Sequence, residues 1–138
     1  MAAIFVRGWL TGTTCIVLLM DLAFAHSFAE EWVAAWNSHD LERILEHYTD
    51  DVVFASPRVV QLMGEPRGEV RGKEALRVYW ERGLKQLPDL LFCLEDVLIS
   101  VDSIVINYRN ERQQAAAEVL TFRDGRVCRG FGAYGPVT

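Results

Sequence analysis

Four runs of strand-forming residues, joined by short turns, fill the C-terminal part of the chain. They cover residues 90–100, 104–110, 113–123 and 126–133. Turns as short as Asp124-Gly125 join neighbouring strands as hairpins, so we expect these runs to pair in order as an antiparallel meander. The chain before residue 88 instead shows the apolar spacing of helices. Helices followed by strands are typical of an α+β fold, here with three helices packed on a curved, mostly antiparallel sheet.

The helical part of the chain contains one expected interruption. A second helix follows Asp40, a natural N-cap, and carries Leu41, Ile44, Leu45 and Tyr48 on its core face. Residues 52–55 then form a short strand, and residues 73–87 form the third helix. The intervening residues 57–72 are expected to form a long loop. Its apolar residues predict either a flap over a cavity mouth or a hydrophobic plug that closes the core.

The first 26 residues allow two interpretations. Ala23-Phe24-Ala25 follows an apolar run and has the form of a signal-peptidase site, which predicts export with cleavage after Ala25. The folded domain would then cover residues 27–138, and a capping box at Ser27 would start its first helix. In the other interpretation the protein is cytoplasmic, residues 1–26 include an unstructured extension, and Asp21 caps a longer first helix. The apolar run is too short for stable membrane insertion in either case.

Composition excludes several classes of function. The 138 residues suit one domain, and a net charge of -5 argues against nucleic acid as a partner because phosphate binding needs a basic surface. Cys15, Cys93 and Cys128 lack the spacing of a metal or redox site, and no His/Asp/Glu cluster has metal-ligand spacing. The sequence therefore predicts no metal and no cofactor.

Three segments resemble the SnoaL-like branch of the nuclear-transport-factor-2-like superfamily. They are WNSHDLERILEHYTDDVVFASP, RGKEALRVYWERGL and AEVLTFRDGRVCRGFGAY, and the resemblance spans residues 27–136. It implies a cone-shaped α+β barrel with a pocket, and a homodimer through the outer sheet face. Such families include polyketide cyclases, ketosteroid isomerases, epoxide hydrolases and dehydratases, together with proteins that only bind or scaffold. The fold therefore implies a pocket but no particular reaction.

The resemblance also relates single positions to ketosteroid-isomerase chemistry. The general base of those enzymes precedes the proline at the end of the first strand, where this chain has Ser56. Their oxyanion-hole tyrosine corresponds to Trp32, and their second oxyanion donor corresponds to Glu118. With serine in place of the base, the resemblance argues against steroid-isomerase activity.

Glu118 is the strongest candidate for chemistry in the sequence. It is the only acid among residues 115–122, and apolar surroundings disfavour its charged form, which raises the pKa and suits an acid–base role. The structural alternative is that Glu118 pairs with Arg129 or Arg109 across the sheet.

A pocket beside Glu118 is expected to bind a small hydrophobic molecule. Its predicted lining comprises Trp32, Trp36, Trp80, Tyr134 and Arg58, with Ser56 as a hydrogen-bonding helper. Two functions remain open on this basis. One is a cofactor-independent acid–base enzyme of the cyclase, isomerase or hydratase type, and the other is a non-catalytic module for ligand binding or dimerisation.

Overall fold

The computed structural model describes residues 4–7, 14–17 and 20–137. Strands β1 (Ile4–Arg7) and β2 (Thr14–Val17) pair antiparallel with each other. The predicted leader, residues 1–26, lies partly outside the described residues, and its role as an export signal or an extension stays a prediction. None of the described helices is long and apolar enough to cross a membrane.

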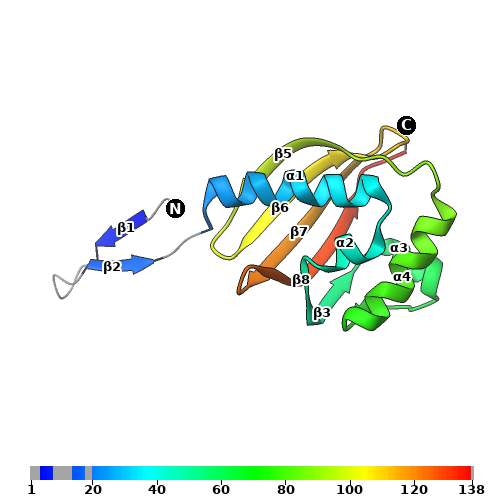
Figure 1. Ribbon diagram of the computed structural model, residues 1–138, viewed down its shortest axis with the longest axis horizontal. Helices are drawn as coiled ribbons and strands as arrows, with labels where there is room; N and C mark the ends of the chain where they lie inside the picture. Colours follow the sequence, from blue (N-terminus) through cyan, green and yellow to red (C-terminus); the bar gives the residue numbers. More distant parts are fainter. Residues whose placement is uncertain (1–3, 8–13, 18–19, 138) are drawn as a thin grey trace.

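One curved, unclosed sheet of six strands forms the body of the domain (Figure 1). Its order is β4-β3-β8-β7-β6-β5, and every neighbouring pair is antiparallel except β3 and β8. The strands are β3 (Tyr48–Ala55), β4 (Glu69–Arg71), β5 (Cys93–Ile99), β6 (Ser103–Arg109), β7 (Ala115–Arg123) and β8 (Arg126–Tyr134). The α+β class and the four-stranded meander predicted from the sequence are confirmed.

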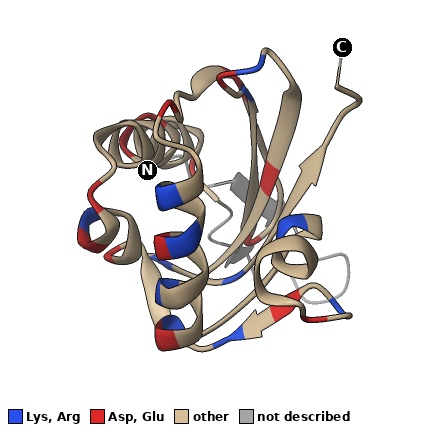
Figure 2. Ribbon diagram, turned by 90° about the vertical axis from the view of Figure 1, so that its right-hand side faces the viewer, with Lys and Arg blue, Asp and Glu red and all other residues tan. Residues whose placement is uncertain are grey.

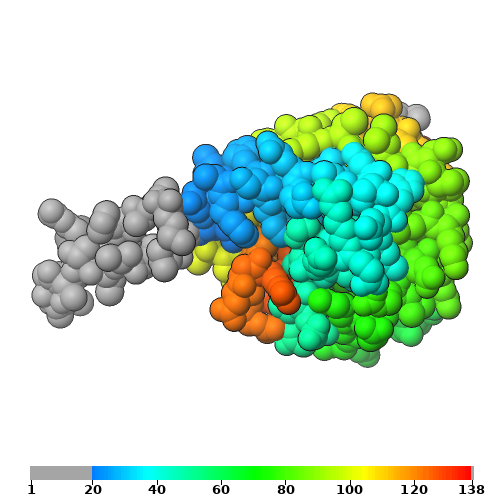
Figure 3. All heavy atoms as spheres, in the orientation of Figure 1, coloured from blue at the N-terminus to red at the C-terminus, as the bar shows by residue number. Residues whose placement is uncertain are grey.

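Four helices, one more than predicted, pack on this sheet. They are α1 (Leu22–Ser38), α2 (Leu41–Leu45), α3 (Pro57–Met63) and α4 (Lys73–Gln86). Helix α1 crosses the sheet beside β5 and α4 packs beside β3, so that α1, α2 and α4 cover one face of the domain (Figure 3). Acidic and basic residues alternate on the exposed side of α4, as in the pairs of Glu81 with Lys85 and Glu74 with Arg77 (Figure 2).

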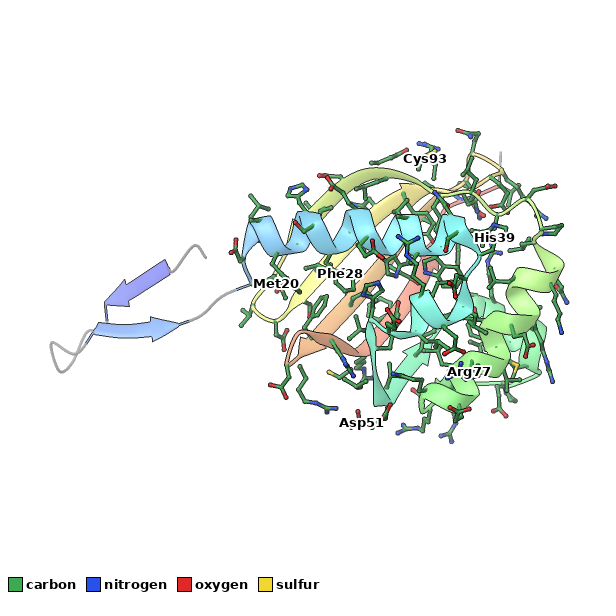
Figure 4. All side chains as sticks on the ribbon, in the orientation of Figure 1. Met20, Phe28, His39, Asp51, Arg77 and Cys93 are labelled. Atoms are coloured by element: carbon green, nitrogen blue, oxygen red, sulfur yellow. The ribbon has the colours of Figure 1, made fainter. Side chains whose placement is uncertain are left out.

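The first helix begins at Leu22, upstream of the capping box at Ser27. The Asp21 carboxylate caps it by accepting a hydrogen bond from the backbone N–H of Ala23 at 2.9 Å. The early start has a packing reason, because Ala25 is fully buried. Phe28, labelled in Figure 4, lies on the buried side of the same helix, with its ring 4.8 Å from the Phe122 ring on β7.

The segment at 57–72 is a short helix followed by a strand, so the prediction of a long loop is wrong. Pro57 occupies the first turn of α3, and Gly64 ends it with a φ of 67°. Strand β4 then pairs antiparallel with β3 at the sheet edge. Both elements rest on tertiary contacts: Val59 is fully buried, and α3 packs against α4.

Tyr48 is the second departure from the expected elements. The sequence places it on the second helix, but α2 ends at Leu45, and Tyr48 starts β3. Its side chain is fully buried in the strand, and a core position of a helix would also be apolar, so the spacing alone does not distinguish the two elements. The early strand start brings the Tyr48 ring to 4.8 Å from the Trp80 ring in the core.

Candidate functional site

A cavity of about 60 Å³ lies between the helices and the sheet. This volume counts the space open to the centres of water molecules, of which one water needs about 10–15 Å³. The cavity therefore holds several waters or one small chemical group. Its walls come from the segment after α4 as well as from the helices and strands. The lining residues are Trp36, Phe54, Arg58, Leu62, Tyr79, Trp80, Gly83, Leu87, Leu90, Phe92, Tyr108, Asn110, Glu111, Glu118 and Tyr134.

Glu118 reaches this cavity from the inner face of β7. Its neighbours across the sheet are Ile106 on β6 and Gly132 on β8. A methyl group on Gly132 would lie 2.8 Å from Glu118 Oε2, 3.3 Å from the Tyr134 hydroxyl and 3.6 Å from Ser56 Oγ. The glycine therefore provides the space in which these three side chains meet, and that space is already filled by their polar atoms.

The Glu118 carboxyl is buried without a hydrogen bond to its Oε2 atom. Desolvation raises its pKa from 4.5 to about 8, and the nearby charge of Arg58 acts in the opposite direction. Neither arginine predicted as a partner lies in that position: Arg109 pairs with Glu95 at 2.5 Å, and Arg129 is exposed. The carboxyl is therefore largely protonated at neutral pH.

All four tyrosines of the chain surround Glu118. Burial raises the pKa of each tyrosine above its usual value, and the Glu118 carboxylate raises it further. Tyr79, Tyr108 and Tyr134 line the cavity, whereas Tyr48 lies in the core behind it. At neutral pH the ring hydroxyls therefore keep their protons and act as hydrogen-bond donors.

Arg58 supplies the positive charge at this site. It follows Pro57 in α3, and its guanidinium carbon lies 4.6 Å from the centroid of the Tyr134 ring. This stacking holds the cation beside the cavity, where its charge acts on Glu118.

Ser56 has a structural task at the end of β3. Its hydroxyl oxygen accepts a hydrogen bond from the backbone N–H of Arg58 at 3.2 Å and so caps α3. The side chain is buried, and it lines a neighbouring hollow together with Gly132. Serine is among the residues that best suit this capping position.

The predicted tryptophans divide between the cavity wall and the core. Trp36 and Trp80 line the cavity, with their rings 5.0 Å apart in an edge-on contact. Trp32 is buried outside the lining, where its Nε1–H donates to the Tyr48 hydroxyl at 3.0 Å and its ring lies 5.4 Å from that of Tyr108. It supports two of the tyrosines around Glu118 from behind.

Several lining residues escaped the sequence-based prediction. Tyr108 and Glu111 come from β6 and the turn after it, and only the alternation of Ile104, Ile106 and Tyr108 signals an inward tyrosine. In the described part of the chain, four buried side-chain polar atoms have no hydrogen-bond partner. Three belong to cavity-lining residues, namely Trp36 Nε1, Glu111 Oε2 and Glu118 Oε2. The described residues contain no cluster suited to a metal ion.

The fold and this cavity define an α+β protein with a buried acid at the centre of a cupped sheet. The SnoaL-like domain family matches residues 29–130, so the chain belongs to that family. A SnoaL-like protein of unknown function from Burkholderia thailandensis is 42% identical, covers 86% of this chain and 100% of its own, and has a TM-score of 0.83. A comparison with curated proteins found no match.

More distant structures share the fold alone. An NTF2-like protein from Anabaena variabilis is 20% identical, with 83% of this chain and 89% of its own covered and a TM-score of 0.69. TerC, co-crystallized with polyporic acid, is 16% identical, with 81% of this chain and 92% of its own covered and a TM-score of 0.67. These structures confirm the nuclear-transport-factor-2-like architecture predicted from the sequence.

Proposed function

We propose that the protein is a cofactor-independent acid–base enzyme acting on a small hydrophobic molecule, with Glu118 as the group that transfers the proton. The observation that carries this proposal is a buried carboxyl at a cavity, with an unpartnered oxygen and a pKa raised to about 8. A proton-transfer group is most effective when its pKa is close to the working pH. The TerC complex with polyporic acid supports small-molecule binding only at the level of the fold.

The chemistry follows from the protonation state of Glu118. With a pKa of about 8, about a tenth of the molecules hold the carboxylate at pH 7. The carboxylate takes a proton from carbon next to a carbonyl, and the resulting carboxylic acid returns it to another atom of the same molecule. Tyr108 and Tyr134 remain protonated because their pKa values are raised, so their hydroxyls stabilise the oxyanion that forms.

Exchange of carbon-bound protons tests this proposal without knowledge of the natural substrate. Small aryl ketones in D₂O are followed by proton NMR, and the wild-type protein is expected to accelerate loss of the signal next to the carbonyl. Glu118→Gln keeps the side-chain shape but removes the titrating group, so the acceleration should disappear. Glu81→Gln, on the exposed side of α4, is the matched control. Equal acceleration by the Glu118 variant would exclude Glu118 as the proton carrier.

A non-catalytic ligand-binding module is the alternative function. It is favoured by the absence of a second carboxyl at Ser56, whose hydroxyl is engaged as the α3 cap. In that case we expect ketones to bind and to quench the fluorescence of Trp36 and Trp80, and we expect no exchange of carbon-bound protons.

We also infer a homodimer through the outer face of the sheet. A row of apolar residues runs across five strands on the side away from the helices: Leu98, Val105, Val119, Phe131 and Ala55 are consecutive cross-strand neighbours. Phe131 and Leu98 are about half exposed, at 47% and 52%. An exposed apolar row of this length across the outer face of the sheet supports burial against a second copy.

A further inference from the structure

A groove of about 450 Å³ adjoins the cavity at its outer end. The two hollows share five lining residues, Arg58, Leu62, Gly83, Leu87 and Tyr134, so they lie side by side. We call this region the outer groove. Its remaining lining residues are Pro57, Gln61, Gln86, Arg112, Gln114 and Val137.

The outer groove is basic although the protein is acidic. Its lining contains Arg58 and Arg112 and no aspartate or glutamate, in a chain with a net charge of -5. Neither arginine forms a salt bridge with any residue that the structure describes. An unpaired pair of cations in a concave surface concentrates positive potential at that point.

The inner cavity differs from the outer groove in its aromatic lining. Apart from Arg58, which both hollows share, its acidic or basic residues are Glu111 and Glu118, and one oxygen of each is buried without a partner. Its walls also contain the rings of Trp36, Trp80 and Phe92. The inner cavity therefore suits the apolar end of a ligand, whereas the outer groove adds a second cation, Arg112.

We propose that the outer groove binds the carboxylate of a small amphiphilic acid whose uncharged apolar end enters the inner cavity. A carboxylate accepts two parallel hydrogen bonds from a guanidinium, which suits Arg58 and Arg112. The amides of Gln61 and Gln86 supply further donors, while that of Gln114 is already engaged with Gly135 O at 2.7 Å. This inference deepens the proposed function, on which it rests only for placing the other end of the ligand beside Glu118.

Three probes with the same phenyl-substituted four-carbon skeleton test the charge preference. Phenylbutyrate, phenylbutanol and phenylbutylamine carry a carboxylate, a neutral hydroxyl and an ammonium, and their binding is measured by isothermal titration calorimetry. The carboxylate is expected to bind about tenfold more tightly than the alcohol, and the ammonium most weakly. Arg112→Gln should weaken the binding of phenylbutyrate about three- to fivefold, the upper part of the range of a solvent-exposed ion pair, and leave the binding of phenylbutanol unchanged. Arg129→Gln, an exposed arginine outside the groove, is the matched control.

The outcomes separate this inference from the proposed catalytic role. Equal affinity of the wild-type protein for acid and alcohol, or no binding of phenylbutyrate at millimolar concentration, would overturn the carboxylate site. An equal loss of affinity for phenylbutyrate and phenylbutanol in Arg112→Gln would also overturn the carboxylate site. A preference for phenylbutyrate that persists in Glu118→Gln supports the site even if the ketone exchange assay shows no catalysis. If Glu118→Gln loses proton exchange but keeps the preference for phenylbutyrate, the result supports both the carboxylate site and the catalytic role of Glu118.

Discussion

Burial of Glu118 predicts a specific dependence of stability on pH. The pKa of this carboxyl is raised from 4.5 to about 8 by desolvation. The folded state therefore binds more protons than the unfolded state between these pH values, and the free energy of unfolding falls as pH rises through that window. At a slope of about 1.4 kcal/mol per pH unit, ionisation of Glu118 lowers the free energy of unfolding of the wild-type protein by up to about 5 kcal/mol between pH 4.5 and pH 8.

Glu118→Gln isolates this contribution, because glutamine keeps the shape and does not ionise. Urea unfolding of the wild type and the variant is followed by tryptophan fluorescence between about pH 5 and pH 9. The variant should gain stability relative to the wild type with rising pH, and the gain should level off above pH 8. Other titrating groups cancel in this difference, including His47, whose pKa is lowered by burial. A difference that does not change with pH would refute the assignment of a buried, partnerless carboxyl.

Three further predictions concern the close packing at Gly132, the α3 cap and the outer face of the sheet. Gly132→Ala places a methyl 2.8 Å from Glu118 Oε2 and should destabilise by about 1–3 kcal/mol, whereas Gly83→Ala makes only an ordinary contact at 3.8 Å and should cost less in the same urea assay. Ser56→Ala removes the α3 cap and should cost about 1 kcal/mol; an unchanged unfolding midpoint would contradict the capping role. Phe131→Glu should convert the proposed homodimer to monomers in sedimentation, and a wild-type monomer would refute the sheet-face interface.

Local pattern was sufficient for most of the architecture. The meander and α4 follow from short-range signals such as Asp124-Gly125 and Pro88, which act within a few residues of the chain. Tyr48 and the segment at 57–72 were assigned wrongly because their state depends on distant partners. Strand β4 exists by pairing with β3, and α3 is held by α4.

The candidate site shows the same division. The amino-acid pattern singled out Glu118 as an isolated acid on an apolar strand, and the family resemblance implied a serine, Ser56, at the position of the isomerase base. The meeting of four tyrosines from three strands and a helix around Glu118 became visible in the fold alone, as did the support of Tyr48 and Tyr108 by Trp32 from outside the cavity. The reason is physical. The pKa of a carboxyl depends on desolvation and nearby charge, and both come from residues far apart in the chain, such as Arg58 and Gly132.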